Sequence, residues 1–218
     1  MATIESGSDQ SQPLVSVGIP TFNRPEGLSR VLQCIQKQTY KNIEVIVSDN
    51  CTPGEKINQL MNSIVSGDGR FRYFRQENNI GVVANFEFVL CKSSGKYFLW
   101  AADDDLCEEN FIERIVTVLE EGPDIVLCTS DVKIINNDDT LLSISKLESI
   151  RVSNNWKRAR RFFFYYPTSN LFFCIYGIFR TEALKHCGIE YVTGWKKIPI
   201  FAEVVFLAKF SELGRIVS

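Results

Sequence analysis

Histidine and closely spaced cysteines are the residues that this sequence most lacks. It has a single histidine, His186, and its seven cysteines include no C-x-x-C pair. The chain therefore lacks the residues for a structural zinc site or a histidine acid/base pair. Any metal ion must be held by carboxylates. The cysteines are odd in number and lie mostly in apolar runs such as residues 125–128, which predicts reduced cysteines that act as small core residues.

Long apolar runs are missing as well. No stretch reaches the roughly 18 residues that suggest a membrane-spanning helix, and the nearest two, 162–166 and 171–176, are interrupted by Pro167 and Asn170. The first twelve residues are polar and lack the apolar segment of a secretory signal. We therefore expect residues 1–13 to be a disordered tail and the protein to be cytoplasmic.

A strong net charge is also absent, since 24 basic and 26 acidic residues leave a formal charge of −2. This balance gives no electrostatic footprint for nucleic acid, which is therefore not expected as a partner. The local basic and aromatic segment 156–166 leaves two interpretations open. One is contact with a lipid-linked acceptor at a membrane surface, and the other is a helix with a solvated cationic face and a buried aromatic one.

Glycine-rich phosphate loops are missing from the position where they would be expected. Neither G-x-G-x-x-G nor G-x-x-x-x-G-K-[ST] follows the first apolar run at residues 14–19. This argues against a dinucleotide-dependent oxidoreductase and against a P-loop NTPase. Without a glycine cradle, a bound diphosphate would need a metal ion.

What the sequence does contain is an alternation of short strands and amphipathic helices. Leu28, Val31, Leu32 and Ile35 have the spacing of a buried helix face, and Pro25 suits the first turn of that helix. The alternation predicts an α/β fold with a mainly parallel central sheet flanked by helices. Besides this helix, the predicted helices are 55–65, 82–91 and 108–120, and the predicted strands are 14–19, 43–48, 71–74, 97–101 and 124–135.

Polar clusters lie at the carboxyl ends of three predicted strands, where open parallel sheets bind their ligands. The most distinctive is the triplet of Asp103, Asp104 and Asp105, because adjacent carboxylates repel one another. A bound Mg²⁺ or Mn²⁺ would compensate this repulsion. The alternative is a solvated turn in which Asp105 and Glu108 form a capping box for the next helix, and the triplet alone leaves both open. The other two clusters are Pro20-Thr21-Phe22-Asn23 and Ser48-Asp49-Asn50.

Four ordered segments together resemble the family 2 glycosyltransferases of the type A, Rossmann-like nucleotide-sugar-binding fold. They are residues 15–24 (Val-Ser-Val-Gly-Ile-Pro-Thr-Phe-Asn-Arg), 38–50, 79–81 with Asn85, and 95–105. The resemblance is strong over residues 14–126 and looser afterwards. It implies a single-domain type A glycosyltransferase fold, with 14–135 as the nucleotide-sugar-binding half and 136–218 as an acceptor-side half that we expect to be truncated at its C-terminus.

The resemblance also implies roles for individual residues. Asp104 would be the principal metal ligand, Asp105 a second ligand or a helix cap, and Asp103 a neighbour of the ribose or the metal. Ala102 stands where the family pattern often has an acidic residue, which leaves open which aspartates share the ion. The residues implied to lie around the donor nucleotide, usually a uridine or thymidine derivative, are Pro20, Thr21, Phe22, Asn23, Asp49, Asn79 and Asn85.

A catalytic base is expected in the second half of the chain. An inverting transfer needs a carboxylate that takes the proton of the acceptor hydroxyl. The nearest match to the family pattern is Glu203, although Val204 stands where the paired pattern has a second acid. An ordinary surface role for Glu203 stays open, and Glu182 and Glu190 are weaker candidates.

The sequence therefore predicts a metal-dependent inverting glycosyltransferase that uses Mg²⁺ or Mn²⁺. It would move a sugar from a UDP- or dTDP-linked donor to a glycan, a lipid-linked or another hydroxyl acceptor. Two alternatives stay open. One is a catalytically silent nucleotide-sugar-binding or interaction module, and the other is a nucleotidyltransferase, although the glycine- and basic-rich loop of that class is missing after the first strand.

Overall fold

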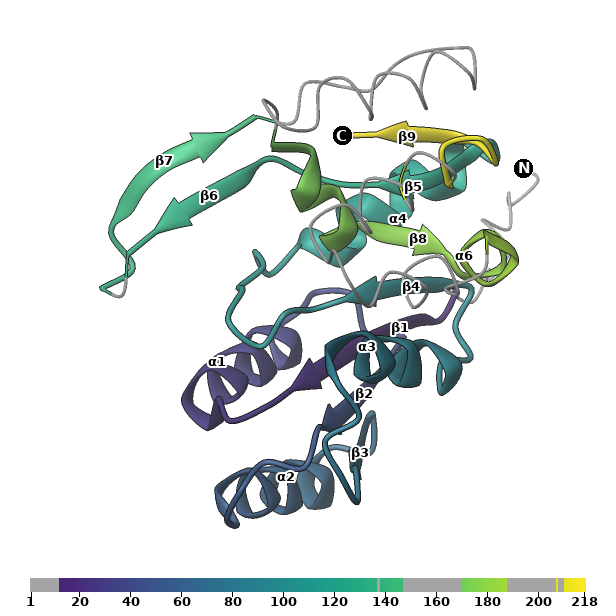
Figure 1. Ribbon diagram of the computed structural model, residues 1–218. Helices are drawn as coiled ribbons and strands as arrows, with labels where there is room; N and C mark the ends of the chain where they lie inside the picture. Colours follow the sequence, from purple (N-terminus) through teal and green to yellow (C-terminus); the bar gives the residue numbers. More distant parts are fainter. Residues whose placement is uncertain (1–11, 137, 147–169, 188–206, 208–209) are drawn as a thin grey trace, which may run out of the picture.

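The computed structural model describes residues 12–136, 138–146, 170–187, 207 and 210–218. Within them, a seven-stranded sheet has the order β3-β2-β1-β4-β8-β5-β9 (Figure 1). β8 runs antiparallel to β4 and β5, whereas the other neighbouring strands of this sheet are parallel. The predicted α/β class and mainly parallel sheet are therefore confirmed. The strands are β1 Val15–Thr21, β2 Ile43–Asp49, β3 Phe71–Arg75, β4 Tyr97–Trp100, β5 Ile125–Cys128, β8 Ile178–Arg180 and β9 Arg215–Val217.

Helices cover both faces of the sheet, which is why β1, β4 and β5 are buried along their whole length. Alternate strand residues feed two apolar layers: Val17 and Val45 pack on the side of α1, α2 and α4, whereas Ile46 and Phe98 pack on the side of α3 and α6. Figure 1 shows α3 in front of the sheet. The helices are α1 Pro25–Gln36, α2 Lys56–Gly67, α3 Val82–Cys91, α4 Phe111–Glu121 and α6 Thr181–Cys187, and a 3₁₀ helix, η2, spans Asn170–Tyr176.

The helix predicted from apolar spacing is α1. Its buried residues are Leu28, Val31, Leu32 and Ile35, and a proline occupies its first turn. The segment predicted as helix 82–91 coincides with α3. For α1, the 3.6-residue apolar period was therefore a reliable signal.

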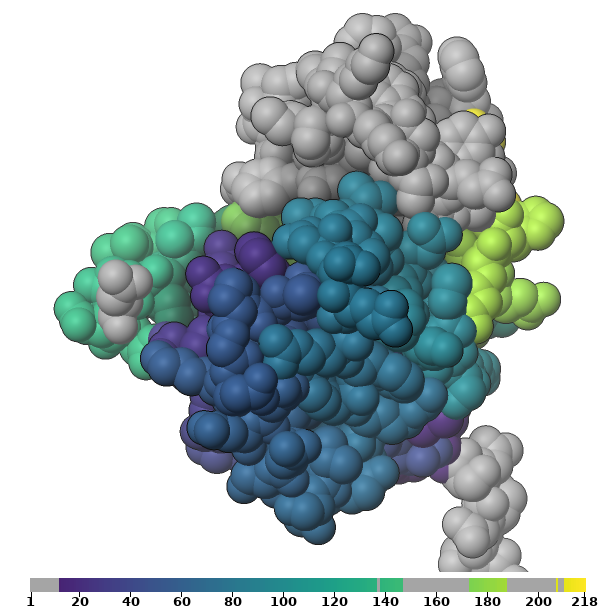
Figure 2. All heavy atoms as spheres, turned by 60° about the horizontal axis from the view of Figure 1, so that its bottom comes forward, coloured from purple at the N-terminus to yellow at the C-terminus, as the bar shows by residue number. Residues whose placement is uncertain are grey.

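The prediction of one continuous strand over residues 124–135 is wrong. β5 ends at Cys128, and β6, Val132–Ile135, leaves the central sheet to pair with β7, Leu141–Ser145, in a separate antiparallel hairpin. Figure 2 shows this hairpin projecting from one side of the body. Polar Ser130 and Asp131 interrupt the apolar run, and β6 is largely exposed where a central strand would be buried.

The expectation that the cysteines are reduced core residues holds in part. All seven are free, and Cys128, Cys174 and Cys187 are buried. Cys91, however, is exposed, and the other three are half-buried. Among the described helices, none is both long and apolar enough to cross a membrane.

Candidate functional site

The loops that follow β1, β2 and β4 meet at one edge of the sheet, which we call the carboxyl edge. β1 is the parallel neighbour of both other strands, and Thr21 at its end pairs in register with Asp49 at the end of β2. Because parallel neighbours end on the same side, the three polar clusters predicted from the sequence come together here.

Asp103 is buried beneath the loop that follows β1. Its exposed fraction is 8%, and its Oδ2 accepts a hydrogen bond of 2.7 Å from the Thr21 hydroxyl. Burial raises the pKa of Asp103, whereas the Thr21 hydroxyl, the Arg24 guanidinium and the Phe22 N–H each oppose that rise. The hydrogen bond fixes the orientation of this carboxylate and ties the loop after β4 to β1.

Arg24 supplies the positive charge that the aspartate triplet requires. Its Nη1 forms a close ion pair with Asp104 and lies 3.4 Å from Asp103 Oδ1. The Arg24 and Asp104 side chains are more than half exposed, at 55% and 57%. The charges of Asp104 and then Asp103 raise the pKa of Arg24, while desolvation followed by the charges of Asp104 and Asp103 raises the pKa of Asp105.

The interpretation of Asp105 as a helix cap is wrong. The next helix, α4, begins at Phe111 with Asn110 at its N-cap, so the expected capping box does not form. The intervening loop is held instead by Gln38, whose buried side chain donates to Glu108 O at 2.8 Å and accepts from the Ile112 N–H at 3.1 Å. Asp105 is thus left on the loop at the carboxyl edge.

Asp49 holds the loop after β2 in place. Its Oδ1 accepts the Thr52 N–H at 3.0 Å, and its Oδ2 accepts the Tyr73 hydroxyl at 3.3 Å with Arg75 Nε 3.9 Å away. The residue is only 1% exposed. In this conformation the carboxylate shapes the loop from beneath, and the predicted place of Asp49 beside the donor nucleotide stays a prediction.

Two asparagines join the loop after β2 to the loop after β3. The Asn50 amide donates to Asn79 Oδ1 at 3.1 Å, and Asn50 Oδ1 accepts the Ile80 N–H at 2.8 Å. Asn79 Oδ1 also accepts the N–H of Gly81, whose φ of 87° most residues avoid. The predicted residue Asn79 therefore lies at the exposed rim of the carboxyl edge, where its side-chain oxygen accepts two hydrogen bonds.

Asn85 lies deeper than the rim. It is buried on α3, where its Oδ1 accepts the Ser48 hydroxyl at 2.6 Å and its amide donates to Ser48 O at 3.0 Å. These bonds attach α3 to the end of β2. Asn85 thus supports the edge from below in this conformation, and its predicted contact with a donor is untested by the geometry.

The loop after β1 presents its side chains unequally. Pro20 is a buried residue of β1, whereas Phe22 is 44% exposed. Asn23 adopts a φ of 57°, and its N–H donates to the Thr52 hydroxyl at 2.8 Å, which links this loop to the loop after β2. An exposed aromatic ring at a ligand-binding edge offers a flat apolar face on which a base can stack.

The acceptor side of the prediction falls largely outside the described residues. Glu203, Glu190 and the basic and aromatic segment 156–166 all lie there. The weaker candidate Glu182 is described, and the structure excludes it as the base. Arg180 pairs with Tyr97 at the start of β4, and Glu182 stands two positions after Arg180. The aspartates follow the other end of β4. The length of this strand, roughly 13 Å, therefore separates Glu182 from the aspartates.

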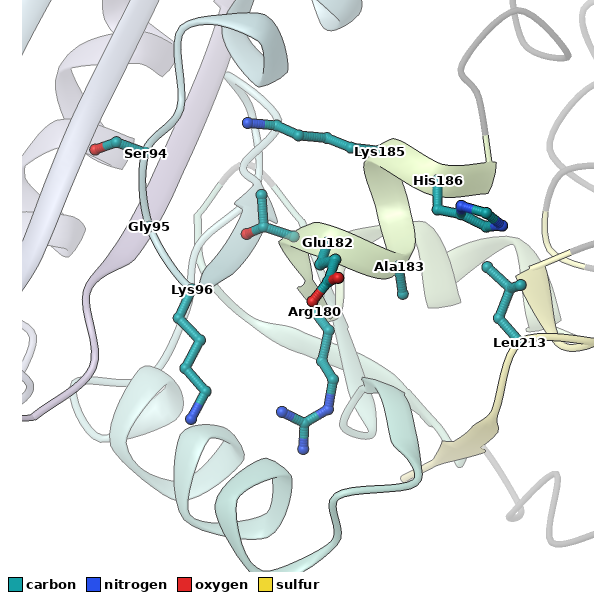
Figure 3. Close-up of a pocket in the computed structure, with 10 residues that line it drawn as sticks. Ser94, Gly95, Lys96, Arg180, Glu182, Ala183, Lys185, His186 and Leu213 are labelled. Atoms are coloured by element: carbon teal, nitrogen blue, oxygen red, sulfur yellow. The ribbon is translucent and has the colours of Figure 1, made fainter.

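A cavity of about 870 Å³ lies at the opposite edge of the sheet, around the start of β4 and α6 (Figure 3). The basic side chains that line this cavity already make contacts within the protein. Lys96 and Arg180 point together toward α4, where Lys96 Nζ lies 2.6 Å from Glu120 Oε1 and Arg180 donates to carbonyls at the helix end. Lys185 donates to Ser93 O at 3.1 Å. This cavity is therefore remote from the aspartates. The carboxyl edge remains the predicted ligand-binding site.

A divalent ion fits the carboxyl edge if a second molecule supplies ligands. Within the described residues, no group of three or more His, Cys, Asp or Glu side chains forms a metal cage. Asp103 and Asp104 nevertheless already share one cation, the Arg24 guanidinium. Mg²⁺ typically takes one or two carboxylates and completes its shell with water and phosphate oxygens. The carboxylates of Asp103 and Asp104 can therefore supply part of the ligand shell of a Mg²⁺ ion. They are too few to form a complete protein cage around a metal ion.

Arg24 and Gln38 are important here, although no individual role was predicted for either residue. Both stand inside segments that carry the family resemblance, which was a signal that could have found them. Their partners lie far along the chain: the aspartates stand 79 and 80 positions after Arg24, and Glu108 stands 70 positions after Gln38. Contacts of such separation become visible when the strands are paired.

The decisive comparison is with a family model. The model described as glycosyl transferase family 2 matches residues 16–188. The chain belongs to this family. The match includes the loops after β1, β2 and β4, so the aspartate triplet and Arg24 lie within the family's matched region.

Relatives of this family 2 chain include an uncharacterized glycosyltransferase of Haemophilus influenzae, 32% identical over 123 residues, with 56% of this chain and 38% of that protein covered. Another is GalNAc(5)-diNAcBac-PP-undecaprenol beta-1,3-glucosyltransferase of Campylobacter jejuni, 30% identical over 111 residues, with 50% and 36% covered. The chain thus spans little more than a third of the length of these two relatives.

Solved structures share the fold of this family 2 chain. TarS of S. aureus in complex with UDP aligns with a TM-score of 0.69 at 18% identity, over 93% of this chain and 56% of that one. The mannosyltransferase PcManGT of Pyrobaculum calidifontis, in complex with GDP-Man and Mn²⁺, aligns with a TM-score of 0.57 at 15% identity, over 82% and 48%. The predicted type A glycosyltransferase fold is confirmed.

Proposed function

We propose that the carboxyl edge binds a nucleotide-diphosphate sugar and that the protein transfers the sugar to a hydroxyl acceptor. One observation carries the proposal: Asp103, fixed by Thr21, and exposed Asp104 share a cation at the meeting point of β1 and β4. Membership of glycosyl transferase family 2 supports sugar transfer as the reaction that these residues serve. A nucleotidyltransferase is disfavoured by the same membership.

The nucleoside is proposed to lie over the loops after β1, β2 and β3. Phe22 offers an exposed ring, and Asn79 lies at the rim. Asp49, Asn85 and the backbone of Pro20 to Asn23 would shape the floor and wall. A uridine or thymidine diphosphate sugar is the proposed donor, a choice supported by the TarS complexes with UDP and UDP-GlcNAc.

Asp104 is proposed as the main ligand of a Mg²⁺ or Mn²⁺ ion, with Asp105 or Asp103 beside it. Bound there with the donor, the ion would supply Lewis-acid stabilisation of the charge on the departing diphosphate. The PcManGT complex with GDP-Man and Mn²⁺ supports this choice. The chain's own part is to orient the carboxylates: Thr21 holds Asp103, and Arg24 must leave Asp104 at least partly as the ion binds.

Transfer is proposed to invert the anomeric carbon, with Glu203 as the base that takes the proton of the acceptor hydroxyl. The acceptor is proposed to be a glycan or a lipid-linked glycan. The name of the Campylobacter jejuni relative, which includes an undecaprenol diphosphate acceptor, supports the lipid-linked class. The segment 136–218 would then contribute the acceptor side of the same domain.

A panel of nucleotide sugars tests donor binding by thermal shift, with and without Mn²⁺. At about 100 times its Kd, a UDP- or dTDP-linked sugar should stabilise the protein by about 2.7 kcal/mol, or roughly 5–10 °C, and much less without metal. Asp104→Asn should lose the metal-dependent part of the shift. The matched control Asp138→Asn, in the exposed turn of the hairpin, should keep it. Equal stabilisation with and without metal would overturn the metal assignment.

Turnover distinguishes a transferase from a silent binding module. Release of the nucleoside diphosphate should depend on a hydroxyl acceptor, and Glu203→Gln should abolish it while leaving the donor-dependent thermal shift unchanged. Donor binding without acceptor-dependent release by the wild-type protein would favour the binding module.

A further inference from the structure

Two cysteines from different elements meet between the last turn of α1 and the loop that follows β4. Cys34 lies on α1, and Cys107 lies in the loop between β4 and α4, 73 positions further along the chain. Their Sγ atoms are 3.2 Å apart. This is about 1.2 Å longer than a disulfide bond, a gap that small side-chain movements can close.

Hydrogen bonds hold the two sulfurs in this arrangement. The Cys34 thiol donates to Cys107 O at 2.8 Å, and the Cys107 N–H donates to Cys34 Sγ at 3.2 Å. The buried Gln38 amide donates to Cys107 Sγ at 3.3 Å. The Cys107 backbone thus holds the Cys34 sulfur, and Gln38 holds the Cys107 sulfur.

A small molecule can reach the pair. Both cysteines are half-buried and line a cavity of about 260 Å³, with Arg30, Lys37 and Leu106 among the other walls. The hydrogen bond from the Cys107 thiol lowers the pKa of Cys34 to about 7, and the charge of Lys37 acts in the same direction. Reactive cysteines characteristically combine access, nearby positive charge and an adjacent second thiol.

We propose that Cys34 and Cys107 form a dithiol modification site that a peroxide converts into an intramolecular disulfide. The Cys34 thiolate attacks a peroxide oxygen, the O–O bond breaks, and a sulfenic acid and hydroxide result. The Cys107 sulfur then attacks the Cys34 sulfur, the S–O bond breaks, and the hydroxyl leaves as water with the thiol proton. In sum, two thiols and hydrogen peroxide give one disulfide and two waters.

The disulfide would join α1 to the loop that carries the aspartates, because Cys107 stands two positions after Asp105. Closing a chain segment of 73 positions also constrains the unfolded state strongly. The oxidised protein should therefore unfold at a temperature about 5–10 °C higher than the reduced one. This goes beyond the proposed transferase activity and needs no donor or metal.

Peroxide titration of the full chain at pH 7, followed by intact mass and peptide mapping, tests the proposal. A crosslinked peptide containing Cys34 and Cys107 should form, about tenfold faster than oxidation of the exposed Cys91, and dithiothreitol should reverse it. The Cys91→Ser control should form the same crosslink. Cys107→Ala should instead stop at a Cys34 sulfenic acid that dimedone traps.

Two results of the peroxide titration would overturn the proposed dithiol site. If Cys34 and Cys107 stay reduced while Cys91 is oxidised, or if the crosslinks that form join other cysteines, no dithiol site exists. The wild-type mapping decides this even where a variant fails to fold. Because the measurement uses neither nucleotide nor acceptor, its failure would leave the proposed function untouched, and the reverse also holds.

Discussion

At the carboxyl edge, the charge of one arginine is divided between two aspartates. Arg24 contacts Asp104 closely and Asp103 at 3.4 Å, on a surface where both exposed partners are screened by water. In the proposed metal site, the guanidinium would therefore compete with a divalent ion for the same oxygens. This competition is mild, because exposed ion pairs contribute at most about 1 kcal/mol.

Arg24→Gln should consequently raise the affinity for Mn²⁺ alone by about 2- to 5-fold, as measured by the loss of the free-ion electron paramagnetic resonance signal. Arg30→Gln removes an equally exposed arginine that pairs with Asp139 and should leave the affinity unchanged. A fall in Mn²⁺ affinity in Arg24→Gln would show that the arginine supports the ion instead of competing with it.

Glu44 links three strands at the opposite edge. Its Oε1 accepts hydrogen bonds from the Ser16 hydroxyl at 2.6 Å and the Ser94 N–H at 2.7 Å, and Arg72 lies 3.3 Å from its Oε2. Burial alone would raise the pKa of Glu44, but these hydrogen bonds and the Arg72 charge lower it overall. As pH falls, the unfolded chain therefore binds this proton before the folded chain does.

Glu44→Gln should lower the free energy of unfolding at pH 7 by about 1–3 kcal/mol. The wild-type protein should lose this advantage as pH falls from the ordinary carboxyl pKa of about 4.3 toward the lower folded pKa. Urea denaturation at a series of pH values measures the difference, and Glu26→Gln, whose side chain is 81% exposed, is the control. Identical acid dependence in wild type and Glu44→Gln would contradict the assignment.

At the scale of single residues, the sequence indicated which residue types gather at the strand ends. It did not indicate which of them are bonded within the protein and which are exposed. The expected parallel sheet brought the polar clusters to one edge, but the bond between Thr21 and Asp103 was not predicted, because it depends on the order of the strands. That Asp49 and Asn85 are buried and bonded within the protein could not be foreseen, since an isolated polar residue in a turn carries no signal of its depth.

At the scale of the elements, α1 packs closely against the loop after β4. A Cβ atom on Gly27 of α1 would lie 2.4 Å from the carbonyl oxygen of Asp103, a backbone atom that cannot move alone. Any side chain at position 27 must therefore push the aspartate loop away from the helix. A glycine inside a helix is normally a cost, so its presence here reflects this contact.

Gly27→Ala should lower the free energy of unfolding by about 1–3 kcal/mol through overpacking and should weaken Mn²⁺ binding in the presence of UDP. The control is Gly67→Ala at the end of α2, where nothing lies within 4 Å of the added Cβ. There the higher helix propensity of alanine should leave stability unchanged or raise it by up to about 1 kcal/mol. Denaturation and metal titration of both variants measure the contrast, and equal effects would refute the close contact.

Element boundaries followed from the sequence where the apolar period was long. α1 was predicted well because its buried residues repeat at helical spacing, whereas α3 was predicted from the alternation of strands and helices. The strand at 124–135 was predicted wrongly because Val132, Ile134 and Ile135 continue an apolar run that the chain uses in an exposed hairpin. Apolar composition alone does not say which sheet a strand joins.

For the whole molecule, the type A glycosyltransferase fold could be predicted from four short segments, and 93% of the chain superimposes on TarS at 18% identity. β8 and β9, contributed by the second half, complete the same sheet as the first half. The acceptor side could not be predicted equally well, because its specificity depends on side chains around a pocket and not on a repeated pattern. Glu203 stays a prediction for that reason.

The central claim is that Asp104 and a nucleoside diphosphate bind one metal ion together. Titration of Mn²⁺ followed by electron paramagnetic resonance, with and without UDP, tests it most directly. We expect UDP to tighten Mn²⁺ binding to the wild-type protein about tenfold or more, and we expect Asp104→Asn to lose this coupling while Asp138→Asn keeps it. Equal coupling in wild type and Asp104→Asn, or none in the wild type, would contradict it.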